Sequence, residues 1–115
     1  MARPWYSDRV PVSVGNSRLD RILGDVVARA VREIHPRRIW LFGSQARATA
    51  TRTSDVDVAF DLTGAARERW SEFVIEASEE VPALVDLDLI DLDACETKLA
   101  HEILRTGRLV YERSP

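Results

Sequence analysis

The sequence predicts a single domain of mixed α and β structure, in which a small mixed β-sheet packs against helices. Segments whose apolar residues recur at helical intervals alternate along the chain with short apolar or alternating segments typical of strands. The chain has 115 residues, of which 45% are hydrophobic. This length suits one domain, and this composition is sufficient for a hydrophobic core.

The first expected helix begins at Ser17 and ends before Pro36. Its apolar residues form one continuous helical stripe, which consists of Leu19, Ile22, Leu23, Val26, Val27, Ala30, Val31 and Ile34. The preceding residues contain two prolines and a Gly-Asn turn signal, which argue against a helix there. We therefore expect an N-terminal arm at residues 1–16 and a folded domain at residues 17–115.

The remaining elements are expected to be strands and helices in alternation. Residues 39–42 are apolar on both faces, as is typical of an interior strand. Residues 55–60 and 85–92 alternate acidic with apolar side chains, which predicts two further strands. A helix is expected between Gly64 and Pro82, and a closing strand at residues 109–111.

The last expected helix runs from about Cys95 to Thr106, with Gly107 as its C-cap. Its inward residues are expected to be Leu99, Ile103 and Leu104.

Composition excludes several classes of protein. With 16 basic and 19 acidic residues the net charge is −3, so a broad basic surface for nucleic acid is not expected. No apolar run approaches the roughly 18 residues of a membrane span, and the first residues lack the apolar region of a signal peptide. A single cysteine, Cys95, cannot form an internal disulfide. We expect a cytoplasmic protein.

The first candidate for a chemical role is Gly43-Ser44, where the first strand ends and a helical turn is expected to begin. Glycine allows the backbone to approach a ligand closely. A serine hydroxyl beside unpaired N–H groups favours a phosphate. Alone, this pattern is more typical of an ordinary turn capped by serine.

The second candidate is the pair Asp55 and Asp57. Side chains two residues apart on a strand share a face, with Cα atoms about 7 Å apart. Adjacent carboxylates repel, and divalent cations would offset that repulsion. A solvent-facing strand fits poorly, because we expect Val58 and Phe60 to continue the face of the two acids, and acids at the end of an apolar face indicate the rim of a cleft.

The third candidate lies on the strand expected at residues 85–92. Asp86 and Asp88 share one face, and Asp91 lies on the other, where we interpret it as a surface residue. If this strand neighbours the strand of Asp55 and Asp57, either Asp86 or Asp88 completes a site of three carboxylates.

Together, Gly-Ser, ten residues and Asp-x-Asp form a pattern with fixed spacing. Residues 41–60, LFGSQARATATRTSDVDVAF, resemble the signature of the DNA-polymerase-beta-like nucleotidyltransferase superfamily. More narrowly, the chain resembles its small stand-alone members, the minimal nucleotidyltransferases, over about residues 18–112. The resemblance implies the single-domain nucleotidyltransferase fold.

The resemblance also implies roles for individual residues. The nucleotide-binding residues would be Gly43, Ser44, Arg47 and Ser54. The catalytic residues and ligands of two Mg²⁺ ions would be Asp55, Asp57 and Asp88, with Asp86 as the fallback for the last. ATP would be the substrate. A pairing of Arg47 with an acid is an equal alternative to phosphate contact.

The resemblance further implies a partner. Minimal nucleotidyltransferases commonly pair with a HEPN-domain RNase toxin and neutralise it by adenylylation (AMPylation) of a tyrosine, by tight binding, or by both. We therefore expect a protein adenylyltransferase that acts as an antitoxin in a hetero-oligomer. The alternatives are an antitoxin that only binds, and an enzyme that modifies a small molecule such as an aminoglycoside. Enzymes of the last class usually carry an additional substrate-binding domain.

Overall fold

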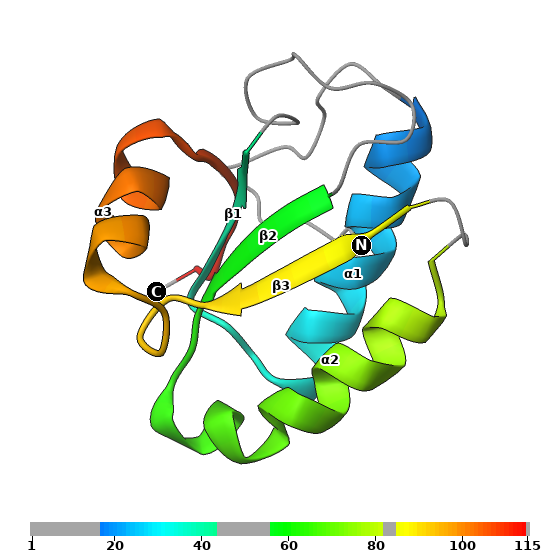
Figure 1. The fold of residues 1–115 in the computed structure, drawn as a ribbon. Helices are drawn as coiled ribbons and strands as arrows, with labels where there is room; N and C mark the ends of the chain where they lie inside the picture. Colours follow the sequence, from blue (N-terminus) through cyan, green and yellow to red (C-terminus); the bar gives the residue numbers. More distant parts are fainter. Residues whose placement is uncertain (1–16, 44–55, 82–84, 115) are drawn as a thin grey trace.

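The computed structural model describes residues 17–43, 56–81 and 85–114, and shows one sheet with helices on both sides (Figure 1). In chain order the elements are α1 (Ser17–Glu33), β1 (Arg38–Phe42), β2 (Val56–Asp61), the 3₁₀-helix η1 (Gly64–Arg69), α2 (Trp70–Glu79), β3 (Leu87–Asp91), α3 (Thr97–Thr106) and β4 (Arg108–Glu112). The expected arm at residues 1–16 lies outside the described residues.

The sheet has the strand order β3-β2-β1-β4. β1 pairs antiparallel with both β2 and β4, whereas β2 and β3 are parallel. The expectation of a mixed sheet is therefore confirmed. The interior position expected for residues 39–42 is also confirmed, because β1 lies between two other strands.

One face of the sheet carries the larger part of the core. Residues from all four strands pack there against α1 and α2, and the largest fully buried side chains include Phe60, Phe73 and Leu23. The rings of Phe60 and Phe73 meet edge to face at a centroid distance of 5.6 Å, and Trp70 lies 5.2 Å from Phe60. Burial of these rings contributes most to the attachment of α2.

Arg29 connects α1 to α2 on this side. Its guanidinium is paired with Glu33 at 2.9 Å, with Glu76 at 3.1 Å and with Glu80 at 2.5 Å. Burial alone would lower the pKa of Arg29, but the hydrogen bonds and negative charge of Glu80 and Glu33 outweigh it, so the pKa is raised. These ion pairs join α1 to the last turn of α2 and the residue that follows it.

The opposite face has a smaller core. Trp40, Ala59 and Ile103 are buried together there, and α3 supplies Ile103. Figure 1 shows α3 on one side of the sheet and α1 and α2 on the other. The ten-residue helix α3 therefore covers this face of the sheet, whereas α1 and α2 together cover the opposite face.

At the end of α3, the expectation for Leu104 is wrong and the expectation that Gly107 is the C-cap is confirmed. Leu104 does not point inward, because it is 54% exposed. Gly107 is the C-cap, but its φ is −71°, so it does not adopt the left-handed conformation usual for a glycine there. A Cβ at Gly107 would instead lie 2.5 Å from the Ile103 carbonyl oxygen, so a close backbone approach requires the glycine.

Of the helices in the described ranges, none is long and apolar enough to cross a membrane.

Candidate functional site

Two of the predicted site aspartates lie side by side on neighbouring strands. In the parallel pairing of β2 with β3, Asp57 is the register partner of Asp88, and in the antiparallel pairing with β1 it is the partner of Phe42. Neighbouring strands are about 4.8 Å apart, so the Cα atoms of these two aspartates are separated by one strand spacing. The expectation that the two acidic strands are neighbours is therefore confirmed.

Gly43 lies directly beside this pair, at the end of β1. It has a φ of +73°, in the left-handed region that favours glycine. A Cβ built on Gly43 would overlap Oδ2 of Asp57 and lie 3.3 Å from its Cγ. The absence of a side chain at Gly43 therefore leaves the space that the Asp57 carboxylate occupies, and Gly43 and Asp57 belong to one site.

Asp86 lies two residues before Asp88, toward the N-terminal end of β3. Its carbonyl accepts a hydrogen bond from the Val56 amide at 2.8 Å. Since Val56 is in register with Leu87, Asp86 lies one register step before that pair and two residues from Asp88. Asp86 and Asp88 are both exposed, and strand alternation places them on the same face as Asp57. The geometry thus puts Asp88 closer to Asp57 than Asp86 is.

The expectation that Val58 and Phe60 continue the acidic face is wrong. Alternation along β2 turns them to the opposite face, where both are fully buried against α1 and α2. The residue that follows Asp57 on its own face is Ala59, whose register partners are Trp40 and Ile90. An apolar row across the sheet therefore does follow the acidic one, but with other residues than expected.

Four predicted site residues lie outside the described residues: Ser44, Arg47, Ser54 and Asp55. Among those described, Gly43, Asp57 and Asp88 are brought together. No group of three or more histidine, cysteine, aspartate or glutamate side chains within the described ranges is close enough to hold a metal ion. The structure thus presents two of the three predicted carboxylates, and the described ranges do not include the third.

The interpretation of Asp91 as a surface residue is wrong. Its side chain is 8% exposed and accepts a hydrogen bond from the Asp93 amide at 3.0 Å. Nε of Arg67 lies 3.7 Å from the carboxylate, and the same arginine also pairs with Asp93. Asp91 therefore ties η1 to the turn after β3. The sequence held the signal, because Asp91 shares strand parity with the apolar residues Leu87 and Leu89.

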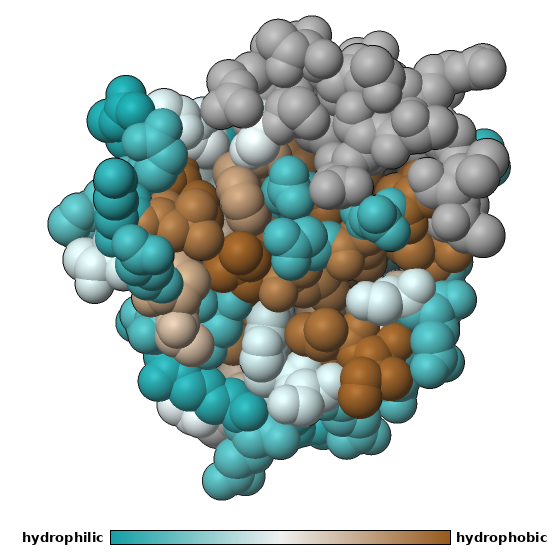
Figure 2. Space-filling view, in the orientation of Figure 1, coloured by the Kyte–Doolittle hydropathy of each residue, from teal (hydrophilic) through white to brown (hydrophobic). Residues whose placement is uncertain are grey.

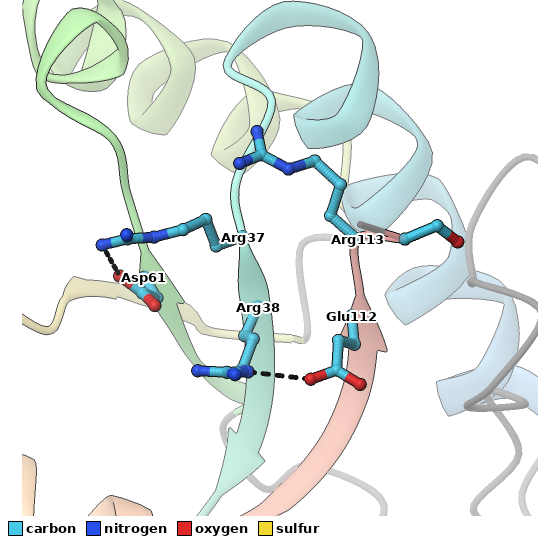
Figure 3. A pocket seen from close by; sticks show the side chains of 6 residues that line it. Arg37, Arg38, Asp61, Glu112 and Arg113 are labelled. Carbon is cyan, nitrogen blue, oxygen red and sulfur yellow. Dashed lines mark hydrogen bonds and ion pairs between the residues drawn. The ribbon is translucent and has the colours of Figure 1, made fainter.

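A separate charged cavity of about 470 Å³ lies at the other end of the sheet (Figure 3). It is lined by Arg37, Arg38, Asp61, Glu112, Arg113 and Ser114.

In this cavity, Arg37 pairs with Asp61 at 3.2 Å, and Arg38 pairs with Glu112 at 3.0 Å. Asp61 is four residues from Asp57 along β2, which is about 13 Å. The cavity is therefore distinct from the aspartate site, and its ion pairs bridge the sheet strands. Buried nearby, Tyr111 has a raised pKa because burial disfavours its charged form, an effect that the charge of Arg113 opposes.

The chain was compared with known families and structures. Residues 26–115 match the family described as "Polymerase beta, Nucleotidyltransferase". No curated protein gives a significant match.

Solved structures with a similar fold include a chain of a toxin–antitoxin crystallised with AMP-PNP. It shares 27% identity, with a TM-score of 0.52, and the alignment covers 78% of this chain and 73% of that one. A chain of the toxin–antitoxin MntA-HepT shares 24% identity over 84% and 72% of the two chains, with a TM-score of 0.50. A protein from Sulfolobus solfataricus shares 19% identity over 89% and 90%, with a TM-score of 0.53. Because the last two structures share less than 25% sequence identity with this chain, they show only that the fold is similar.

The contact between Gly43 and Asp57 gives a test of the site. We expect Gly43→Ala to lower the free energy of unfolding by about 1–3 kcal/mol, because alanine is strained at positive φ and its Cβ would overlap the carboxylate. Gly64→Ala is the matched control, since a Cβ there meets no atom within 4 Å. Urea denaturation measures both. Equal stability of the two variants would contradict the close approach.

Proposed function

Because this chain belongs to the polymerase beta nucleotidyltransferase family, we propose that it transfers AMP from ATP to a hydroxyl of a partner toxin and thereby acts as an antitoxin. The toxin is proposed to be a HEPN-domain RNase, and the acceptor a tyrosine. Family membership supports nucleotidyl transfer in general, while the acceptor is the specific part of the proposal.

The observation that carries the proposal is the register of Asp57 with Asp88 beside Gly43. Like charges on directly opposed strand positions are destabilising, so this arrangement has a cost to folding. A site that binds divalent cations and phosphate offsets that cost when it is occupied. An antitoxin that only binds its partner has no such use for adjacent carboxylates.

The described residues fit part of a magnesium site. Carboxylate oxygens are ligands that Mg²⁺ prefers, and Asp57 and Asp88 supply them from adjacent strands. We propose that Asp55 joins them and that Gly43 and Ser44 hold the triphosphate. When bound, Mg²⁺ would neutralise charge on the phosphates and lower the pKa of the attacking hydroxyl.

The reaction then assigns a role to each residue. The acceptor oxygen attacks the α-phosphorus of ATP, a new P–O bond forms, and the bond to the bridging oxygen breaks to release pyrophosphate. Asp88 accepts the hydroxyl proton, since its exposed carboxylate is open to the acceptor's side. Asp57, held against Gly43 at the end of β1, would hold the Mg²⁺ that offsets the repulsion between its own carboxylate and the phosphates.

One of the comparisons supports both the partner and the nucleotide. The relative that shares 27% identity was crystallised as a toxin–antitoxin with AMP-PNP, an ATP analogue. A partner that carries the acceptor hydroxyl also suits a chain in which a single sheet and its helices fill most of the sequence.

Substitution of Asp57 tests catalysis. We expect Asp57→Asn to lower the rate of AMP transfer by about 100-fold or more, because a neutral amide binds Mg²⁺ poorly. The assay uses labelled ATP, Mg²⁺ and the product of the neighbouring gene, which we propose to be the HEPN protein. Asp25→Asn, which makes the same change on the exposed side of α1, is the matched control and should leave the rate unchanged. A stable but unlabelled complex with the wild-type chain would instead establish the binding-only antitoxin.

The register of β2 with β3 also distinguishes Asp88 from Asp86. We expect Asp88→Asn to reduce transfer as strongly as Asp57→Asn, and Asp86→Asn to reduce it at least about 10-fold less, since Asp88 is the register partner of Asp57. Both residues are exposed, so neither variant should lower the melting temperature, and Asp88→Asn should raise it slightly because it removes the repulsion with Asp57. The reverse order of effects would assign the third carboxylate to Asp86.

A further inference from the structure

The acidic site continues directly into an apolar area on the same face of the sheet. Beyond the Asp57–Asp88 row lie Ile90 on β3 and then Leu92, the residue that follows the strand. Leu99 on α3 faces them, and all three side chains are only half-buried. We refer to Ile90, Leu92 and Leu99 as the open patch.

The open patch exists because α3 covers this face unevenly. Ile103 of α3 is buried against Trp40 and Ala59, above the central strands, with 1% of its surface exposed. Toward the edge strand β3 the cover is incomplete. Figure 2 shows apolar surface there, between α3 at the left and hydrophilic residues at the centre of the view.

The two faces of the sheet restrict how an acceptor can reach the aspartates. The opposite face is filled by α1 and α2, whose buried residues include Leu23, Val27 and Phe73. Asp57 and Asp88 lie on the face of α3. A macromolecule that brings a hydroxyl to them therefore approaches this face, and the open patch is the apolar surface next to them.

Charges around the open patch indicate the complementary partner. Asp86 lies exposed at one end, and Glu96 lies exposed in the connection between Leu92 and Leu99. Asp88 is left out of this comparison because bound Mg²⁺ would offset its charge, and Asp93 because it pairs with Arg67. Asp86 and Glu96 outnumber Lys98 in the first turn of α3. Charge complementarity then favours basic side chains on whatever covers the patch.

We propose that the open patch is the docking surface for the protein that supplies the acceptor hydroxyl, through apolar side chains flanked by lysine or arginine. This inference rests on the proposed function, because that function requires a protein acceptor. Docking here would place the acceptor's hydroxyl beside Asp88 and would also exclude water from the site.

A charged substitution in the open patch tests the proposal. We expect Leu92→Glu to raise the Kd for the HEPN protein by about tenfold or more in isothermal titration calorimetry, since it puts a charge into an apolar contact. Ile75→Glu is the matched control, because Ile75 is 59% exposed on α2, which packs on the other face. It should change the Kd by less than about twofold.

A second pair of variants tests the docking surface independently, in case Leu92→Glu does not fold. Glu96→Lys replaces a fully exposed side chain and should weaken binding of a basic partner about threefold to tenfold, with less effect at high salt. Glu79→Lys makes the same change at the end of α2 and should leave the Kd unchanged.

The outcomes separate this inference from the function on which it rests. Loss of AMP transfer by Leu92→Glu that is restored at high partner concentration would support docking, whereas Asp57→Asn should stay inactive at any concentration. Wild-type affinity and transfer in both Leu92→Glu and Glu96→Lys would overturn the docking surface and leave the proposed function standing. Absence of any complex with the wild-type chain would overturn both.

Discussion

The parallel pairing of β2 with β3 is the constraint on which the other parts of this structure depend. Parallel neighbours cannot be joined by a tight turn, so the chain must cross over between them, here through η1 and α2. The crossover places α2 beside α1 on one face, where Phe60, Phe73 and Trp70 pack together. The same pairing sets Asp57 level with Asp88. One backbone arrangement therefore determines both the main core and the acidic site.

The site is built where regular structure stops. β1 ends at Phe42, and the next residue, Gly43, has a positive φ that lets the chain turn away from the sheet beside Asp57. Glycine adopts this conformation without steric strain, so the backbone of β1 can end against the Asp57 carboxylate. The charged cavity at the opposite end of the sheet is built differently, because Arg37 and Arg38 pair there with carboxylates of β2 and β4.

Much of this fold could be predicted from the sequence because its local signals agree with its tertiary contacts. The helical stripe from Ile22 to Ile34 and the apolar residues of β1 each reflect a burial pattern that the structure confirms, and the alternation of acidic with apolar residues located β2 and β3. Less could be predicted at positions whose burial depends on tertiary contacts. Leu104 lies on the exposed side of α3, although a leucine beside Ile103 favours burial. The pairing of the buried Asp91 with Arg67 joins residues that are distant in sequence.

In the candidate site, too, some features could be predicted from the sequence and others depend on tertiary contacts. The spacing of Gly-Ser and Asp-x-Asp pointed to Gly43 and Asp57, and the family resemblance pointed to Asp88. The register of the strands brings these three together. The apolar surroundings were assigned to the wrong residues, because Val58 and Phe60 have the opposite strand parity from Asp57. The open patch could not be read from the sequence at all, since it depends on how much of one face α3 covers.

The central claim is that Asp57 and Asp88 form a divalent cation site at one end of the sheet. The most direct test is a titration of the ¹⁵N-labelled full chain with Mn²⁺, whose unpaired electrons broaden the NMR signals of nearby amides. We predict saturable broadening centred on the amides of Asp57 and Asp88 and its reversal by excess Mg²⁺. Broadening centred instead on Asp61 and Glu112, about 13 Å away along the strands, would contradict the account.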